Sequence, residues 1–139
     1  MLGGTDRVNR ISNKTQNITM GKSYTDLDAW KLGRELVTDI YTITSLFPKE
    51  EIFGLTSQMR RSAVSIPSNI AEGIGRNHAK DTLQFLHIAR GSSYELETQL
   101  YLSFDIKYLE SQKLEQIQIK IVSCKKLLNG LINYYQSKL

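Results

Sequence analysis

Residues Gln58 to Arg76 read QMRRSAVSIPSNIAEGIGR, and apolar side chains recur through them with the period of an α-helix that has one buried face. Taken back to residue 52, the apolar positions three and four apart are Ile52, Leu55, Met59, Ala63, Ile66 and Ile70. A second line of the same period is small or polar and consists of Gln58, Ser62, Ser65, Asn69, Glu72 and Arg76. The pattern predicts one helix whose polar flank either packs against small residues or serves as a subunit interface or ligand surface.

Pro67 lies inside this predicted helix. It has no backbone N–H and its ring crowds the carbonyl of Ala63, so the sequence predicts a kink, or a break that costs about 3 kcal/mol if nothing compensates. Pro48 suits the first turn of the helix, and Gly73-Ile74-Gly75 marks its end. That Gly-x-Gly follows no strand and lacks a third glycine at the required place, which favours a helix C-cap over a nucleotide-binding loop.

A preceding helix is predicted from Thr25, its expected N-cap, to the Phe47-Pro48 pair, with Asp28 completing a capping-box-like pattern. Its expected buried side comprises Trp30, Leu36, Val37, Ile40, Ile43, Thr44 and Phe47. The connection to the next helix is short, so these two helices should be antiparallel neighbours.

A third helix is predicted from Asn77, its expected N-cap, to about Tyr108. Its expected seam is Leu86, Ala89, Ser93, Leu96, Leu100 and Phe104. Gly91 lies in mid-helix, where glycine costs about 1 kcal/mol relative to alanine and therefore needs a reason. We expect two helix backbones to approach closely there, with small residues of the preceding helix opposite: Ser62, Ala63 and Ser65.

A fourth helix is predicted after Ser111, its expected N-cap. Its apolar positions follow a strict heptad: Leu114, Ile117, Ile121, Cys124, Leu128, Leu131 and Tyr135. Cys124 occupies a core position in this pattern, so we interpret it as a small buried hydrophobe and not as a nucleophile.

The four helices and their short turns predict an all-α, antiparallel up-down-up-down four-helix bundle over residues 23–139. Residues 1–22 lack periodicity and are rich in Asn, Thr and Gly, so they are expected to form a flexible N-terminal extension with a mild positive charge. Translation from Met20 instead of Met1 is an open alternative.

Composition bounds the class of protein. A chain of 139 residues with 40% hydrophobic and 23% charged residues is expected to form one globular domain. A single cysteine excludes an internal disulfide and fits a reducing compartment. No apolar run approaches the ~20 residues of a membrane span, and the first residues contain no apolar signal region. We therefore expect a cytoplasmic protein without membrane association.

No recognisable catalytic or metal-binding motif is present. A di-metal bundle site needs two Glu-x-x-His pairs, but Gly75 and Gln84 stand three residues before the two histidines, His78 and His87. The sequence also lacks a zinc motif, a phosphate-binding Gly-rich loop and a Ser-His-acid spacing. We expect a non-enzymatic protein with no catalytic residue, metal or cofactor; an active site assembled between subunits is the enzymatic alternative.

Charge placement suggests a polyanion as partner. The net charge is +4 and the sequence pI about 9.2, with basic residues concentrated in the second, early third and fourth predicted helices. Four of them are candidate phosphate contacts, and the last two are expected on the outside of the fourth helix: Arg76, Lys80, Lys125 and Lys126. The alternative is that these are ordinary solvated faces. We further hypothesise that Glu95 pairs with Arg60 or Arg61 and so fixes helix register.

Several of these residues together resemble a known family. The chain is similar, from about Tyr24 to Leu139, to the four-helix bundle proteins encoded by intervening sequences in bacterial large-subunit ribosomal RNA genes. That family includes the accessory variability determinant of diversity-generating retroelements. The matching positions are Phe47-Pro48 through Glu51, Gly54-Leu55, Gln58, Arg60-Arg61, Ser65-Ile66, Asn69 through Gly73, Gly75-Arg76, Phe85-Leu86, Ala89, Gly91-Ser92 and Glu95 through Glu97.

The resemblance implies a homo-oligomer, expected to be a pentamer, of antiparallel bundles with a basic exterior. It also implies binding to RNA or DNA, with a reverse transcriptase as a protein partner in the retroelement relative. Residues expected to order the bundle and its interfaces are Arg60, Arg61, Asn69, Glu72, Gly91, Ser92 and Glu95. The leading hypothesis is a nucleic-acid-binding accessory or scaffold protein; its rivals are a purely structural protein-protein interaction module and an enzyme with an intersubunit site.

Overall fold

The computed structural model describes residues 23–139, which form four long helices and two short 3-10 turns. The predictions for residues 1–22, a flexible extension and a start at Met20, lie outside the described residues. The elements in chain order are η1 (Tyr24–Asp26), α2 (Asp28–Thr44), η2 (Lys49–Glu51), α3 (Leu55–Ile74), α4 (Ala79–Asp105) and α5 (Ser111–Gln136).

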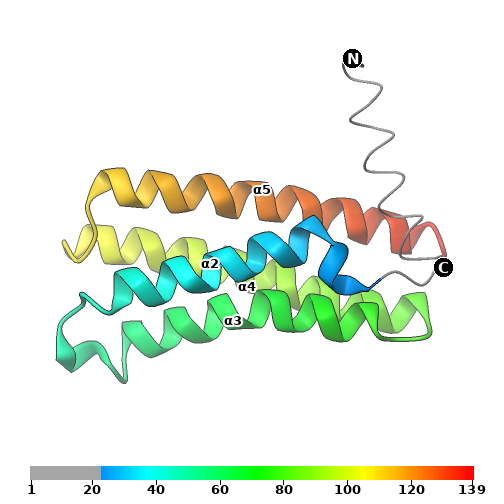
Figure 1. The fold of residues 1–139 in the computed structure, drawn as a ribbon, viewed down its shortest axis with the longest axis horizontal. Coiled ribbons are helices and arrows are strands. Elements are labelled where there is room, and N and C mark those ends of the chain that lie inside the picture. Colours follow the sequence, from blue (N-terminus) through cyan, green and yellow to red (C-terminus); the bar gives the residue numbers. More distant parts are fainter. Residues whose placement is uncertain (1–22) are drawn as a thin grey trace, which may run out of the picture.

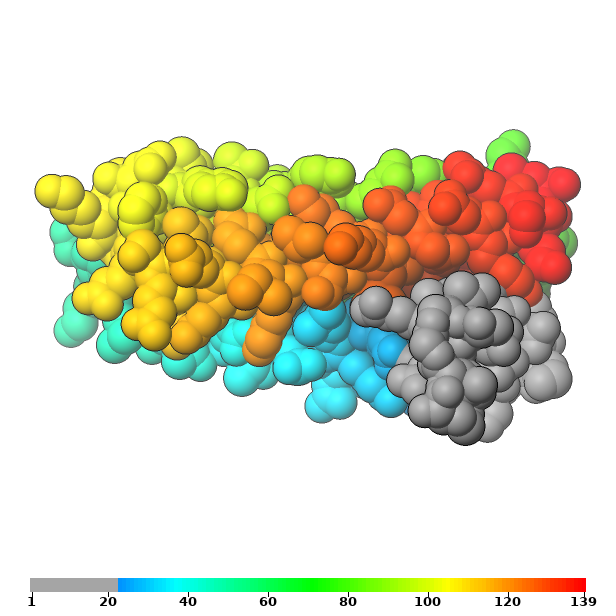
Figure 2. Space-filling view, turned by 90° about the horizontal axis from the view of Figure 1, so that it is seen from above, coloured from blue at the N-terminus to red at the C-terminus, as the bar shows by residue number. Residues whose placement is uncertain are grey.

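The long helices form a bundle in which successive helices run in opposite directions (Figure 1). Each helix packs against the next in the chain, and α5 returns to pack against α2, which closes the bundle. Figure 2 shows this closure from above, with α5 lying between α4 on one side and α2 on the other. The predicted all-α fold with four helices is therefore confirmed for residues 23–139.

The predicted seams of α4 and α5 are buried almost throughout. In α5 every seam position from Leu114 to Leu131 is buried, and Tyr135 is half-buried. In α4 the seam holds as far as Leu100, but Phe104 is 39% exposed and Ser103 takes its place in the core. Ser103 can be buried because its hydroxyl donates to the Gln99 carbonyl at 2.8 Å, which satisfies the polar group.

Helix starts differ from the sequence prediction where short turns intervene. Thr25 is not the N-cap of α2; it lies in the turn η1, where the Ser23 hydroxyl accepts its N–H at 3.2 Å. Buried Leu27, with an extended backbone, then separates η1 from α2. The caps of α4 and α5 each differ by one residue, being His78 and Glu110.

The second predicted helix is also shorter than expected at its start. Pro48 precedes the separate turn η2, and α3 begins only at Leu55, whose N–H is accepted by the Glu51 carboxylate at 3.3 Å. Ile52 consequently lies outside the seam and is 47% exposed. The α3 core positions from Met59 to Ile70 are fully buried, as predicted.

Pro67 does not break α3, which is continuous from Leu55 to Ile74. The ring is buried against Gly33 of α2, where an added Cβ would lie 3.3 Å from Pro67 Cδ. The missing side chain of Gly33 provides the space for the ring, so burial of the ring offsets the hydrogen bond that proline cannot make.

The close helix approach predicted at Gly91 does not occur within the chain. Gly91 is exposed, and an added Cβ would meet no described heavy atom within 4 Å. The close approach lies at Gly73, where an added Cβ would come within 2.9 Å of Phe85 Cβ and 3.1 Å of the Thr82 carbonyl. The Thr82 hydroxyl donates to the Gly73 carbonyl at 2.8 Å, so this contact ties the end of α3 to the start of α4.

Candidate functional site

The predicted cations Arg76 and Lys80 lie on either side of the turn from α3 to α4. Arg76 forms an ion pair with Glu72 one helical turn earlier at 3.1 Å, and its guanidinium lies over the Phe85 ring at 4.7 Å. Both members of the pair are about half exposed, so it stabilises the fold little. Lys80 is exposed and has no charged partner among the described residues. This end of the bundle therefore presents accessible positive charge.

Lys125 does not lie on the outside of α5, which corrects the sequence prediction. Its ammonium group is 3.0 and 3.1 Å from the two oxygens of Glu97 and 4.3 Å from the centre of the Tyr94 ring. The side chains of Lys125 and Glu97 are only 16% and 22% exposed. Glu97 thus neutralises Lys125, which links α5 to α4, whereas Lys126 is exposed.

The four predicted phosphate contacts are not one patch. Lys125 lies beside Glu97, which is 17 residues along α4 from Lys80 and therefore about 26 Å away at 1.5 Å per residue. Lys126 is exposed on α5, about 100° around the helix from Lys125. A phosphate-binding surface on the bundle would have to use Arg76 and Lys80 separately from Lys126.

Most of the net positive charge of the chain lies in residues 1–22. Residues 1–22 contain 4 of the 18 basic residues and 1 of the 14 acidic residues. Residues 23–139 accordingly contain 14 basic and 13 acidic residues, which leaves the bundle nearly neutral. Three of the four net positive charges thus belong to the first 22 residues. The charges along the sequence are the signal that marks residues 1–22 as a candidate binding segment.

A line of small polar side chains joins α3 to α4. The Ser62 hydroxyl donates to the Glu95 carboxylate, and the Ser65 and Ser92 hydroxyls are 2.7 Å apart. Asn69 donates to the carbonyl and the hydroxyl of Ser65 at 2.8 and 2.9 Å. These contacts join the two helices side by side. Small side chains face each other at Ser65 and Ser92, whereas Ser62 meets Glu95 and the predicted close approach at Gly91 is absent from the described residues.

The hypothesised ion pair between Glu95 and Arg60 or Arg61 is wrong. Glu95 binds Ser62, while Arg60 turns the other way, towards α2. Its Nε donates to the Thr44 hydroxyl at 2.9 Å and its guanidinium lies over the Tyr41 ring at 4.4 Å. Arg61 is exposed and has no ion-pair partner in residues 23–139. Small side chains on both helices leave Glu95 within reach of a hydroxyl.

The outer side of α4 carries apolar side chains that the bundle does not cover. On the same side of the helix as the exposed Gly91, the exposed fraction is 49% for Ile88, 52% for Tyr94 and Tyr101, and 48% for Leu102. We call this surface the α4 face; it consists of Ile88, Gly91, Tyr94, Glu95, Tyr101 and Leu102. The sequence signal was present, since these apolar residues fall outside the predicted seam of the helix.

The described residues offer no metal centre or reactive thiol. No group of three or more His, Cys, Asp or Glu side chains in residues 23–139 is placed to hold a metal ion. Cys124 is fully buried, and burial raises the pKa of its thiol to about 12, so it stays protonated. None of the helices between residues 23 and 139 combines the length and apolar character needed to cross a membrane.

Burial of the Cys124 thiol predicts that the stability of the fold depends on pH. Above about pH 8.5 the unfolded chain ionises Cys124 while the folded chain keeps it protonated, so the free energy of unfolding should fall. One thiol contributes up to about 1.4 kcal/mol per pH unit, until the pH reaches its folded pKa of about 12. Urea denaturation between pH 8 and 10 measures the slope. Cys124→Ala should lower stability at every pH but make the slope shallower; an unchanged slope would contradict the assignment.

A further prediction concerns the ion pair between Lys125 and Glu97, which links α5 to α4. Lys125→Gln leaves the mostly buried Glu97 carboxylate without its cation, so we expect the free energy of unfolding to fall by about 1–3 kcal/mol. Lys126→Gln makes the same change one residue on, at an exposed position, and should alter it by no more than about 0.5 kcal/mol. Urea denaturation of the two variants compares them; equal losses would show that the Glu97 contact contributes nothing.

Comparison with known proteins agrees with this fold and extends it to a family. The family described as 23S rRNA-intervening sequence protein matches residues 25–130, which is most of the chain. The chain belongs to this family. The match begins within η1 and ends within α5, so it covers all but the last turns of the bundle.

A solved structure has a similar fold. It is a protein of unknown function from the S23 ribosomal protein family of Bacteroides thetaiotaomicron VPI-5482, with 25% sequence identity and a TM-score of 0.70. The similarity covers 76% of this chain and 95% of that chain. No curated protein matches the chain. The comparisons thus give the family and the fold of the chain, but they name no activity for it.

Proposed function

We propose that the protein is a non-enzymatic homo-oligomer of four-helix bundles that binds RNA or DNA as an accessory protein in the cytoplasm. The observation that carries the proposal is the separation of charge. Residues 1–22 hold three of the four net positive charges, while residues 23–139 are close to neutral. A basic segment attached to a neutral bundle can contact phosphates without the bundle itself reading the sequence of the nucleic acid.

Self-assembly would make this segment effective. One copy neutralises only a few phosphates, and binding through so few contacts is weak at physiological salt. A homopentamer would bring five copies together, with about 15 net positive charges on residues 1–22, and simultaneous contacts raise the overall affinity. Exposed Arg76, Lys80 and Lys126 would add contacts from the bundle. Lys125 has no part in the proposal because Glu97 already binds it.

The α4 face is the proposed surface of self-assembly. It exposes four large apolar or aromatic side chains along one helix, which is typical of a surface that another chain covers. A Cβ added at Gly91 would have no heavy atom of residues 23–139 within 4 Å, so a second helix backbone can approach it closely. A glycine in mid-helix is thus explained by a partner outside the chain, and Ser92 and Glu95 lie at the edge of the same surface.

The protein partner in this proposal is a reverse transcriptase or another enzyme that acts on nucleic acid. Its basis is the similarity to the accessory variability determinant of diversity-generating retroelements. Such a partner would use the oligomer to hold template or product close to its own active site. This part of the proposal is tested by co-purification with a reverse transcriptase from the same genome.

The experiment that tests the proposed function is light scattering of the purified full-length protein. The protein is measured alone and with a mixed pool of structured RNA and DNA, at about 50 mM and about 500 mM salt. We expect a particle several times the 15.9 kDa of one chain that takes up nucleic acid at low salt and releases it at high salt. A particle that ignores nucleic acid at both salt concentrations would rule out the binding function.

A second candidate is a purely structural protein-protein interaction module. The near-neutral bundle, with 14 basic and 13 acidic residues, favours this candidate, because a dedicated polyanion-binding fold usually carries an excess of basic residues. It predicts the same oligomer, no salt-sensitive uptake of nucleic acid, and full function after the basic residues of positions 1–22 are neutralised.

A further inference from the structure

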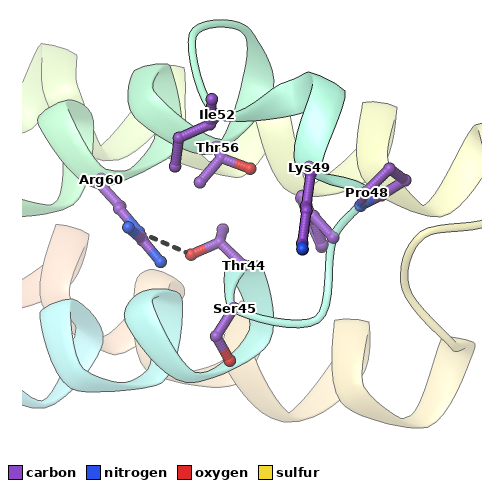
Figure 3. Close-up of a pocket in the computed structure, with 8 residues that line it drawn as sticks. Thr44, Ser45, Pro48, Lys49, Ile52, Thr56 and Arg60 are labelled. Carbon is purple, nitrogen blue, oxygen red and sulfur yellow. Dashed lines mark hydrogen bonds between the residues drawn. The ribbon is translucent and has the colours of Figure 1, made fainter.

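A hollow of about 410 Å³ lies between the end of α2 and the start of α3. Its polar lining consists of two cations, Arg60 and Lys49, and the hydroxyl-bearing residues Thr44, Ser45 and Thr56. In Figure 3 the guanidinium of Arg60 and the ammonium group of Lys49 lie on either side of Thr44. No carboxylate lines the hollow, which gives it a positive charge that nothing in the described chain neutralises.

Arg60 is held in place and keeps free donors. Its Nε donates to the Thr44 hydroxyl at 2.9 Å, and the Tyr41 ring lies under the guanidinium at 4.4 Å. Its two terminal nitrogens make no hydrogen bond with any described residue. These nitrogens are the parallel donors that bind two oxygens of a phosphate or carboxylate at once.

The Glu51 carboxylate of the same connection is already engaged. One oxygen of Glu51 accepts the Leu55 N–H at 3.3 Å, and the other accepts the Tyr108 hydroxyl at 2.9 Å. Glu51 therefore links the α2–α3 connection to the α4–α5 connection at the same end of the bundle, and it does not line the hollow. The cations Arg60 and Lys49 are left without an ion-pair partner in residues 23–139.

Thr56 adds a free hydroxyl to the lining of the hollow. The residue as a whole is only 2% exposed, and its hydroxyl makes no hydrogen bond with the described residues. This hydroxyl is therefore available to donate to a group bound in the hollow.

We propose that this hollow binds the phosphate group of a small phosphate monoester. The Arg60 fork would hold two phosphate oxygens, with the Lys49 ammonium and the Thr56 hydroxyl donating to the dianion. The volume lies within the range of small-molecule sites, about 300–1,000 Å³, and leaves room for an organic group beside the phosphate. Phe47, Pro48 and Ile52 supply an apolar wall for that group. The site does not depend on nucleic-acid binding by residues 1–22.

Isothermal titration calorimetry with the full-length protein tests the site, using phenyl phosphate, inorganic phosphate and benzoate as probes. We expect saturable binding of one phenyl phosphate per chain, weaker binding of inorganic phosphate, which lacks the apolar group, and weakest binding of benzoate, which carries a single charge. Arg60→Gln should weaken phenyl phosphate binding at least tenfold, and Arg60→Lys, which keeps the charge but loses the fork, nearly as much. The matched control is Arg61→Gln, an exposed arginine one residue away, which should leave the affinity unchanged.

Two further variants protect the test if Arg60→Gln folds poorly. Lys49→Gln changes an exposed side chain, and Thr56→Val keeps the shape of the residue while removing the unpaired hydroxyl. Each should weaken binding about threefold or more. Failure of phenyl phosphate to saturate the wild-type protein at 10 mM, or equal weakening by Arg60→Gln and Arg61→Gln, would overturn the proposal.

A last comparison identifies the source of the phosphate. A short oligonucleotide with a 5′-phosphate is titrated against the same oligonucleotide without it, in wild-type protein and in Arg60→Gln. A preference for the phosphorylated end that Arg60→Gln abolishes would assign the site to nucleic-acid ends. Equal binding of the two oligonucleotides, with phenyl phosphate still bound through Arg60, would assign it to a free small molecule.

Discussion

Neutralising the basic residues of positions 1–22 is expected to reduce the affinity for nucleic acid about a hundredfold or more at 0.1 M salt. The variant carries glutamine at four positions: Arg7, Arg10, Lys14 and Lys22. Each phosphate contact contributes about 0.7–0.9 to the slope of log affinity against log salt, so the loss of three or four contacts accounts for this decrease relative to binding at about 1 M salt. Fluorescence anisotropy with a labelled RNA, measured at several salt concentrations, gives both the affinity and the slope.

The matched control neutralises four exposed lysines of the bundle. Glutamine at Lys31, Lys107, Lys113 and Lys138 makes the same change in net charge on residues 23–139. If the first segment carries the binding, this control should lose less than about tenfold. Equal losses in the two variants would mean that net charge alone attracts the nucleic acid, and the assignment to residues 1–22 would fail.

Replacing Gly91 with arginine is expected to dissociate the oligomer completely. A Cβ added at position 91 meets no described heavy atom within 4 Å, so the long arginine side chain should fit the isolated bundle. Because arginine favours a helix more than glycine does, the stability of the isolated bundle should even rise by about 0.5–1 kcal/mol. In the assembly the same side chain would occupy the space of the neighbouring backbone and bury an unpaired charge. Light scattering should then report the mass of one chain, 15.9 kDa.

Gly130→Arg is the control for this change. Gly130 is also exposed and lies within a helix, and a Cβ added there would have no described heavy atom within 4 Å. Its exposed helix neighbours are polar, among them Lys126 and Asn133, so it belongs to no apolar surface. The variant should retain the full oligomer. Dissociation by both variants, or by neither, would move self-assembly away from the α4 face.

The period of the apolar residues was sufficient to predict the bundle and most of its core. It could not predict the turns, because η1 and η2 depend on local hydrogen bonds, such as the Ser23 hydroxyl to the Thr25 N–H, that follow no period. The contact of Pro67 with Gly33 was equally hidden, since it joins two helices through the absence of a side chain.

The site residues were harder to predict because a charge in a sequence does not reveal its partner. Lys125 and Lys126 are adjacent in sequence, yet one is bound to Glu97 and the other is exposed. The sequence predicts that Glu95 pairs with an arginine of the preceding helix. In the structure, a turn of about 100° per residue places Ser62 next to Glu95 and directs Arg60 towards α2. Only the packed structure decides which neighbour a long side chain meets.

The direction of the helices has a further consequence for how the molecule can be attached to others. Helix α2 begins and α5 ends at the same end of the bundle (Figure 1). The hollow beside Arg60 is lined by residues from the end of α2 and the start of α3, so it lies at the opposite end. The 17 residues of α2 separate the two ends by about 26 Å. A fusion partner or surface tether joined at Ser23 or Leu139 would therefore leave the hollow accessible, and the bundle would act as a rigid spacer between the two.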